Sequence, residues 1–249
     1  MKYQEISIII PCYKESAVIE GTIAAIFSYL HENFERFEII VVTDGSPDDT
    51  PEKVKSFGQR HSEIPLKLIS FKKNRGKGAA VKEGVLASQY ELVLFLDADL
   101  TISIEELGKF LPAIETSDIA IASRLVPGSI FEERTPWYRT ILARGFFFLQ
   151  MLLLGNLKYS DTQCGFKLLR KDVARELFER VLIKRFAFDA ELLFLAKKMN
   201  FSVTVLPVTI KKDARNTNVH VLRDPFDMFF ALLKIRSNFW FGYYNIPKH

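Results

Sequence analysis

The strongest constraint on the fold is the alternation of short apolar runs with helical segments in the N-terminal half. Runs typical of buried strands occupy residues 6–10, 38–42, 66–71 and 92–96; helical periodicity follows from Val18 to Leu30, from about Pro51, and from Ala79 to Ser88. This alternation predicts an α/β fold, a doubly wound, mostly parallel sheet with helices on both faces. We expect the functional residues in the loops at the carboxyl ends of the strands, which line one crevice.

Two carboxylates follow the fourth apolar run. Asp97 and Asp99 come directly after Leu92–Leu96 and are separated by Ala98. Alternate residues of an extended segment point the same way, so the two acids could share one Mg2+ or Mn2+ ion that holds the diphosphate of a nucleotide. A strand that ends in an ordinary polar turn is the other interpretation.

The other strands also lead into polar loops. Pro11 is expected to end the first strand, and Asp44 lies just beyond the second. The third run precedes Gly76-Lys77-Gly78, which could bring backbone close to a phosphate with Lys77 as a countercharge. These glycines lack P-loop spacing, so hydrolysis of a nucleoside triphosphate is not indicated. A glycine turn with a solvated lysine is an equal alternative.

Five motifs occur in a fixed order along the chain. They are SIIIPCYKE from Ser7, VVTDGSPDDT from Val41, NRGKGAAV from Asn74, LFLDADL from Leu94 and DTQCGFKLL from Asp161. From Ile6 to about Arg236 the chain therefore resembles the inverting family-two glycosyltransferases with the GT-A fold, and among them the enzymes that load a sugar onto a polyprenyl phosphate. ASRLVPGS, PWYRTILAR and DTQCGFK make it most similar to the dolichyl-phosphate β-glucosyltransferases.

This resemblance implies metal-dependent, inverting transfer of a hexose from a nucleotide sugar to a polyprenyl or dolichyl phosphate. UDP-glucose is the first expectation for the donor, and GDP-mannose, as in the dolichyl-phosphate mannose synthases, is the second. A polysaccharide acceptor and a non-catalytic subunit that binds nucleotide sugars remain as alternatives, the latter disfavoured by the intact acid pair and Asp161.

The resemblance also implies roles for individual residues. Asp97 and Asp99 would hold the metal, and Asp99, Asp161 and Arg124 would act at the reacting centre. The acceptor is a phosphate monoester with a second pKa of ~6, so Asp161 is expected to organise a sugar hydroxyl or an arginine more than to abstract a proton. Positions expected to bind the nucleotide sugar are Pro11, Tyr13, Glu15, Val42, Asp44, Lys77, Asp97, Ala98, Arg124, Asp189, Glu191 and Arg215. Those expected to bind the acceptor phosphate are Arg134, Arg139, Arg144 and Gln163.

Several of these residues have plainer interpretations. Asp189 and Glu191 are equally compatible with a helix cap and a first-turn acid. The arginines from Arg134 to Arg144 follow two glutamates and could form a solvated, self-paired face.

The length and composition fit one glycosyltransferase domain. The 249 residues suffice for a full core, and the apolar content of 48% argues against disorder. We expect a nucleotide-sugar half at 1–124, an acceptor half at 125–220 and an amphipathic, membrane-proximal helix at 221–249. The net charge of +4 is too small to indicate a nucleic-acid partner, and Cys12 and Cys164 lack metal-type spacing.

Two apolar segments bear on membranes. Residues 145–154 are far shorter than the ~20 needed to span a bilayer, and residues 225–244 are aromatic but carry Asp227, Lys234 and Arg236. Because residues 1–5 run straight into the first strand, no N-terminal targeting signal is expected. The expectation is a cytoplasmic protein bound peripherally to the cytoplasmic face of a membrane. Packing against the core or against a partner subunit in an oligomer is the alternative.

Overall fold

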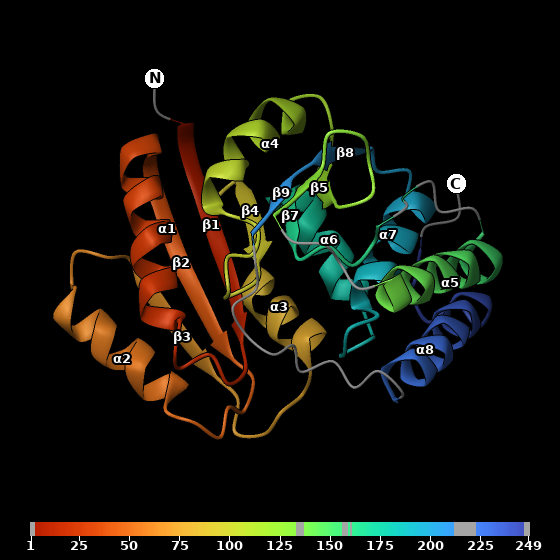
Figure 1. Ribbon diagram of the computed structural model, residues 1–249, viewed down its shortest axis with the longest axis horizontal. Helices are drawn as coiled ribbons and strands as arrows, with labels where there is room; N and C mark the ends of the chain where they lie inside the picture. Colours follow the sequence, from red (N-terminus) through yellow and green to blue (C-terminus); the bar gives the residue numbers. More distant parts are fainter. Residues whose placement is uncertain (1–2, 133–136, 156–158, 160, 212–222, 247–249) are drawn as a thin grey trace.

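A seven-stranded sheet in the order β3-β2-β1-β4-β7-β5-β8 forms the centre of the computed structural model, which describes residues 3–132, 137–155, 159, 161–211 and 223–246 (Figure 1). Paired strands run parallel, except that β7 is antiparallel to both β4 and β5. The strands are β1 (Tyr3–Cys12), β2 (Phe34–Thr43), β3 (Leu66–Ser70), β4 (Leu92–Leu96), β5 (Ile119–Ser123), β7 (Phe166–Arg170) and β8 (Val203–Pro207). A small parallel pair joins β6 (Ile130–Phe131) to β9 (Thr209–Ile210).

Helices cover both faces of the sheet. They are α1 (Ile19–Asn33), α2 (Thr50–Arg60), α3 (Lys77–Leu86), the short 3-10 helix η1 (Ile104–Glu106), α4 (Leu107–Ile114), α5 (Trp137–Leu154), α6 (Lys171–Arg180), α7 (Phe188–Lys198) and α8 (Arg223–Trp240). Ile8 and Ile10 of β1 face the core under α1, α2 and α4, whereas Ile9 faces the core under α3, α6 and α7. The predicted doubly wound, mostly parallel α/β fold is confirmed.

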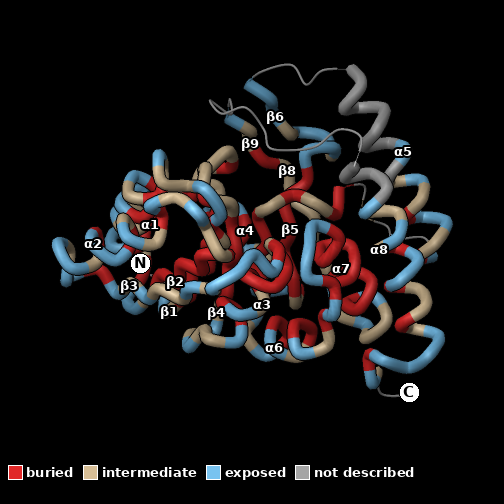
Figure 2. The backbone as a smooth tube through the Cα atoms, turned by 90° about the horizontal axis from the view of Figure 1, so that it is seen from below, coloured by how far each residue is buried: buried red, intermediate tan, exposed pale blue. Residues whose placement is uncertain are grey.

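The central strands are buried on both sides. Ile6, Ile8, Ile9 and Ile10 of β1 are all fully buried, which is why β1 reads as a continuous apolar run and not as an alternation. Figure 2 shows buried residues concentrated in the middle of the molecule and exposed ones along the outer helices.

Pro11 lies inside β1, where it pairs with Val42, so the prediction that it ends the strand is wrong by one residue. The pairing of β1 with β4 stops at Ile9 and Phe95. Because Pro11 lies beyond that point, its missing N–H removes no hydrogen bond on the β4 side.

The helices α5 and α8 pack side by side at one end of the molecule (Figure 1). Several of their large apolar side chains are exposed, among them Leu152, Phe230 and Trp240. None of the helices within the described ranges has both the length and the apolar character required to cross a bilayer.

Candidate active site

One edge of the sheet gathers the carboxyl ends of the parallel strands β1, β2, β4 and β5. Because β7 runs the opposite way, its first residue, Phe166, pairs with the last residue of β4, Leu96. The segment 161–165 before β7 therefore meets the acids after β4. The fit is close, since a Cβ atom on Gly165 would overlap the carboxylate of Asp97.

The acid pair lies in a turn and not on an extended segment. The strand β4 ends at Leu96, residues 98 and 99 form a turn, and Leu100 follows with a φ of 49°. Oδ1 of Asp99 accepts hydrogen bonds from the N–H (3.0 Å) and the hydroxyl (3.1 Å) of Thr101. The expectation that strand alternation aligns the two acids is therefore wrong. The relative orientation of their carboxylates is set by the turn instead.

Lys77 at the start of α3 pairs with the first acid. Its Nζ lies 2.5 Å from Oδ1 of Asp97. Burial alone would lower the pKa of Lys77, but the negative charges of Asp97, Asp189 and Asp99 and the hydrogen bond to Asp97 together outweigh burial, and the pKa is raised. The solvated-lysine interpretation is thus excluded, and Lys77 places a permanent positive charge next to the acid turn.

Asp44, just beyond β2, holds the loop that leads to Lys77. Its two carboxylate oxygens accept hydrogen bonds from the backbone N–H groups of Arg75 (2.6 Å) and Gly76 (2.8 Å), and its carbonyl accepts from Nδ2 of Asn74 (3.1 Å). Each oxygen has a second lone pair with which it could accept a bond from a nucleotide base. The expected base contact stays a prediction, and loop anchoring is the role that the geometry assigns.

The loop after β1 is tied to the loop after β2. The N–H of Lys14 donates to Ser46 (2.7 Å) and that of Glu15 to Thr50 (3.0 Å). Lys14 has a φ of 61°, which turns the chain sharply between the half-exposed Tyr13 and Glu15. Tyr13 and Glu15 thus lie beside the same edge as Asp44.

Two predicted donor-site residues have buried side chains instead. Val42 packs in a small cluster with Ile40 and Ala80 beneath α3. Ala98 packs in the core on the α1 side, and its carbonyl accepts a hydrogen bond from Thr22 (2.5 Å). Any contact of these residues with a nucleotide sugar is therefore limited to backbone.

Arg124 and Asp161 form a two-pronged ion pair at the end of β5. Nε and Nη2 of Arg124 lie 2.7 and 2.9 Å from the two carboxylate oxygens, and the N–H of Arg124 donates to Oδ2 at 2.9 Å. The side chain of Asp161 is 5% exposed and that of Arg124 is 43% exposed. The guanidinium therefore keeps donors for an anion while the carboxylate fixes its orientation.

The same pair sets the charge states. Burial alone would raise the pKa of Asp161, but the hydrogen bonds and positive charge of Arg124 lower it below its usual range. Burial opposes ionisation of Arg124 as well, and Asp161 overcomes it, so the pKa of Arg124 is raised. At neutral pH, Asp161 is an ionised partner of an arginine and is poorly suited to take up a proton.

A second ion pair lies inside the core behind this edge. Lys167 of β7 is fully buried, and its Nζ lies 2.5 Å from Asp189 and 2.6 Å from the carbonyl of Cys164. Burial raises the pKa of Asp189 although the charges of Lys167 and Lys77 act against it. No role for Lys167 follows from the motifs alone. The signal for a buried ion pair is a single cation between Phe166 and Leu168 in an otherwise apolar strand.

Glu191 is not directed to this edge. It is fully buried on α7, and its carboxylate accepts hydrogen bonds from the N–H groups of Leu182 (3.0 Å) and Ile183 (2.8 Å) and the hydroxyl of Tyr244 (2.6 Å). The predicted contact of Glu191 with the nucleotide sugar therefore does not agree with the contacts of its carboxylate.

The predicted acceptor residues are only partly described. Arg134 and Arg215 lie outside the described residues, and Arg139 and Arg144 lie on α5 at positions whose side chains are not described. Nε2 of Gln163 lies 3.9 Å from the sulfur of Met228 on α8. Gln163 thus connects the motif before β7 to α8.

The sequence was compared with models of known protein families. A family model described as glycosyl transferase family 2 matches residues 7–178. The chain belongs to glycosyl transferase family 2. It is therefore a glycosyltransferase, and the predicted membership is confirmed.

Two curated relatives narrow the similarity within the family. The dolichyl-phosphate beta-glucosyltransferase of Dictyostelium discoideum is 31% identical over 98% of this chain and 77% of its own length. A protein of the same description from Trichomonas vaginalis is 35% identical over 93% of this chain and 72% of its own length.

A solved structure agrees with the fold of this family-two glycosyltransferase. Glucosyl-3-phosphoglycerate synthase from Mycobacterium tuberculosis, solved in complex with Mn2+ and UDP-glucose, superposes with a TM-score of 0.63 at 17% identity. The match covers 98% of this chain and 80% of the other. The sheet described above is thus the GT-A fold.

Proposed function

We propose that this family-two glycosyltransferase transfers glucose from UDP-glucose to dolichyl phosphate or a related polyprenyl phosphate, with inversion at the anomeric carbon. The descriptions of the relatives support this sugar and this acceptor. The observation that carries the proposal is the meeting of the Asp97–Asp99 turn with the Arg124–Asp161 pair at one sheet edge. A diphosphate donor and a phosphate acceptor each need such a charged partner.

The acid turn fits a divalent ion that is completed by substrate. Within the described ranges, His, Cys, Asp and Glu form no group of three or more that could hold a metal. Mg2+ and Mn2+ are commonly bound through one or two carboxylates together with substrate phosphates, which suits Asp97 and Asp99. A bound ion would neutralise the diphosphate and favour its departure. Lys77 adds a fixed positive charge beside it.

The reaction needs positioning more than proton transfer. A phosphate oxygen of the acceptor attacks the anomeric carbon, and the new bond forms as the bond to the UDP oxygen breaks. An α-linked donor then gives a β-linked product. The acceptor phosphate is largely a dianion at neutral pH, with a second pKa of ~6, so no base is required. Arg124, oriented by Asp161, holds this phosphate for attack.

A lipid acceptor requires a surface that faces the membrane. We define the membrane face by the exposed apolar side chains of α5, α8 and the turn after α8: Phe148, Met151, Leu152, Phe230, Leu233, Trp240 and Phe241. An exposed apolar area of this kind is typical of a membrane or protein contact. Gln163 contacts α8 through Met228, so this face adjoins the acceptor side of the site. The protein then binds the cytoplasmic face of the membrane peripherally.

The test is a donor screen with radiolabelled UDP-glucose and GDP-mannose, a short polyprenyl phosphate and Mg2+ or Mn2+. The expected result is label from UDP-glucose in the organic phase, lost with a chelator and restored by the metal. Label from GDP-mannose alone would replace the donor assignment. Turnover without a polyprenyl phosphate would refute the acceptor.

The matched variants for this assay are Asp99→Asn and Asp172→Asn. Asp99→Asn should keep less than about a tenth of the wild-type rate, because losing a metal ligand costs more than the ~1.4 kcal/mol that a tenfold change represents. Asp172 is 70% exposed on α6, away from the edge, and its variant should behave like the wild type. Both should unfold at the wild-type temperature within a few degrees. A higher residual rate in Asp99→Asn would contradict the metal role.

A further inference from the structure

A buried carboxylate joins the segment after α8 to the loop between α6 and α7. One oxygen of Glu191 accepts hydrogen bonds from the N–H groups of Leu182 and Ile183, and the other accepts from the hydroxyl of Tyr244 at 2.6 Å. Tyr244 is 1% exposed, whereas its neighbour Tyr243 is 64% exposed. Glu191 thus holds two segments that are far apart in the sequence.

That loop in turn supports the start of α3. The carbonyl of Lys184 accepts a hydrogen bond from the N–H of Ala79 at 3.0 Å. Gly76 has a φ of 101°, and a Cβ atom there would collide with the Lys184 carbonyl. A Cβ atom on Gly78 would come within 2.8 Å of the Ile183 carbonyl. Glycine is therefore needed at both positions, because a side chain at either would push the start of α3 away from the backbone of Ile183 and Lys184.

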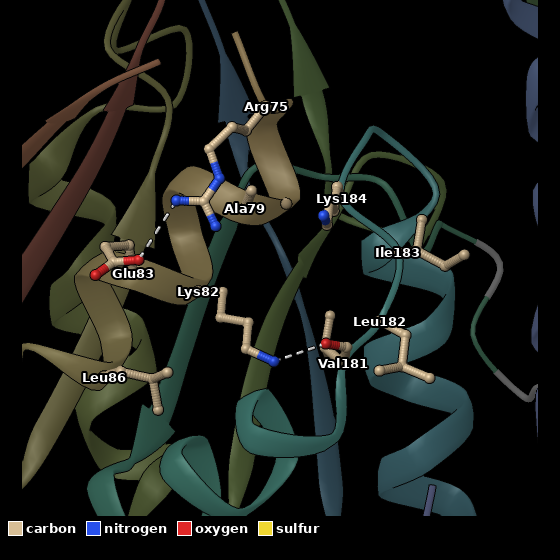
Figure 3. Close-up of a pocket in the computed structure, with 10 residues that line it drawn as sticks. Arg75, Ala79, Lys82, Glu83, Leu86, Val181, Leu182, Ile183 and Lys184 are labelled. Carbon is tan, nitrogen blue, oxygen red and sulfur yellow. Dashed lines mark hydrogen bonds and ion pairs between the residues drawn. The ribbon is translucent and has the colours of Figure 1, made fainter. Parts of the chain in front are cut away.

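A third link joins the same two elements. Nζ of Lys82 on α3 donates to the carbonyl of Val181 at 2.8 Å, and Figure 3 shows this side chain crossing from α3 to the loop. A pocket of about 230 Å3 opens between them, lined by residues of α3 and of the loop from Val181 to Lys184. The loop from Val181 to Lys184 is thus fixed to the first turns of α3.

The supported turn carries Lys77. Asp44 holds Arg75 and Gly76 from the other side, so the turn is fixed between Asp44 and the Lys184 carbonyl. A shift of the loop would remove one of these two supports and move Lys77 relative to Asp97.

We propose that Glu191 and Tyr244 are positioning residues of the donor site, acting through the 182–184 loop on the Gly76–Gly78 turn and Lys77. The assignment of a nucleotide-sugar donor to that site rests on the proposed function. In this arrangement Glu191 acts through the loop, because its carboxylate is bonded to Leu182, Ile183 and Tyr244. This role takes the place of its predicted contact with the nucleotide sugar. Tyr244 lies in the segment after α8 and was not singled out from the sequence.

The first test measures binding of UDP with Mg2+ by calorimetry, and KM and kcat, in Tyr244→Phe, with Tyr243→Phe as the matched control. Both changes remove one phenol hydroxyl, but only Tyr244 holds Glu191. Tyr244→Phe should raise the Kd for UDP and the KM for the donor roughly three- to tenfold, the effect of losing one hydrogen bond. The KM for the acceptor should stay unchanged. Glu191→Gln, which keeps one acceptor oxygen, should lie between Tyr244→Phe and the wild type.

A merely structural role would lower the unfolding temperature without changing donor affinity well below it. That result for Tyr244→Phe, with donor KM and Kd at wild-type values, would overturn the proposal. An equal effect of Tyr243→Phe would also overturn it.

The second test does not depend on the donor. The N–H of Ala79 is shared between the carbonyls of Lys184 (3.0 Å) and Gly76 (2.9 Å), so its exchange is read together with that of Leu182 and Ile183, whose N–H groups donate to Glu191. Exchange at Ala79, Leu182 and Ile183 should speed up in Tyr244→Phe and stay at the wild-type rate in Tyr243→Phe. If the wild type bound no nucleotide, the proposed function would fail while faster exchange at Ala79 still supported the link. Unchanged exchange at all three amides would refute the link itself.

Discussion

Asp161 is almost fully buried, yet its pKa is lowered. Burial disfavours the charged form, but Arg124 supplies hydrogen bonds from its backbone N–H and from its guanidinium, together with a positive charge. A carboxylate held in this way orients the guanidinium much as a buried acid orients a catalytic base. The ionised Asp161 carboxylate therefore stabilises the fold at neutral pH. This stabilisation is lost only as the pH falls below the ordinary pKa of an aspartate and through the lowered pKa of Asp161.

Asp161→Asn should therefore lower the rate without adding a pH dependence near neutrality. The amide cannot form the same two-pronged ion pair, so Arg124 loses its fixed orientation. The measurement is kcat/KM for the variant and the wild type from about pH 6 to about pH 9, a range that covers about one pH unit or more on either side of neutrality.

A general-base role predicts a different profile. Wild-type kcat/KM would then fall tenfold per pH unit on the acid side, and this limb would vanish in Asp161→Asn. That pattern would contradict the arginine-orienting role. The unfolding temperature should also be compared at neutral pH, where the variant lacks the ion pair and should be less stable.

Gly165 shows how two elements fix each other. The motif before β7 and the acid turn after β4 touch at this residue, where any Cβ atom would overlap Asp97. Gly165→Ala should displace Asp97 from Lys77 and lower kcat/KM by more than tenfold, while the cores on both faces of the sheet stay packed. The measurement is kcat/KM together with the circular dichroism melting curve.

Gly21→Ala is the matched control for this change. A Cβ atom on Gly21 in α1 would meet nothing within 4 Å, and alanine in a helix is favoured over glycine by about 1 kcal/mol. The control should keep full activity and unfold at a slightly higher temperature. An active Gly165→Ala enzyme would mean that the exact contact with Asp97 is not required.

The elements of the N-terminal half could be predicted because parallel strands buried on both faces leave continuous apolar runs. The reversed strand β7 could not be predicted in this way, since its short run between Gly165 and Lys171 carries no sign of direction. That reversal brings Asp161 to the acid turn. The turn at 98–99 could not be predicted either, because local periodicity does not report loop shape.

Glu191 gives α7 a predictable pH response. Burial raises its pKa from 4.5 to about 7, although the hydrogen bond from Tyr244, the N–H groups of Ile183 and Leu182, and the charge of Lys82 act against this. Between pH 4.5 and about pH 7, Glu191 keeps its proton in the folded protein but has released it in the unfolded chain. The free energy of unfolding should therefore fall as the pH rises through this window.

Glu191→Gln should lack this slope, because glutamine does not titrate. Urea unfolding at several pH values across the window would measure the difference between the two proteins. Parallel curves for the wild type and Glu191→Gln would show that Glu191 ionises at its ordinary pKa. The difference should level off above about pH 7, the value to which the pKa is raised.

At the scale of the whole molecule, charge and exposed apolar surface meet on α8. Leu232 and Ile235 are fully buried against the core, while Phe230, Leu233 and Trp240 are exposed. The guanidinium of Arg236 lies 4.9 Å from the ring centre of Trp240. An apolar surface with cations beside it suits an anionic bilayer, where each cation near the surface contributes about 1 kcal/mol.

The corresponding prediction is that the chain floats with liposomes. Binding should be stronger with anionic lipid, should weaken with salt, and should keep a salt-resistant part from apolar insertion. The variant Leu152→Glu/Phe230→Glu places a charge on each helix of the membrane face and should abolish flotation. Ser56→Glu/Gln59→Glu adds the same charge on α2, at the other end of the molecule (Figure 1), and should float like the wild type, because only the position of the charges differs. If the wild-type protein stayed in the soluble fraction with every lipid, α5 and α8 would belong to a protein interface instead. An exposed apolar face that does not bind lipid is expected to be covered by another chain or by a second copy of this one.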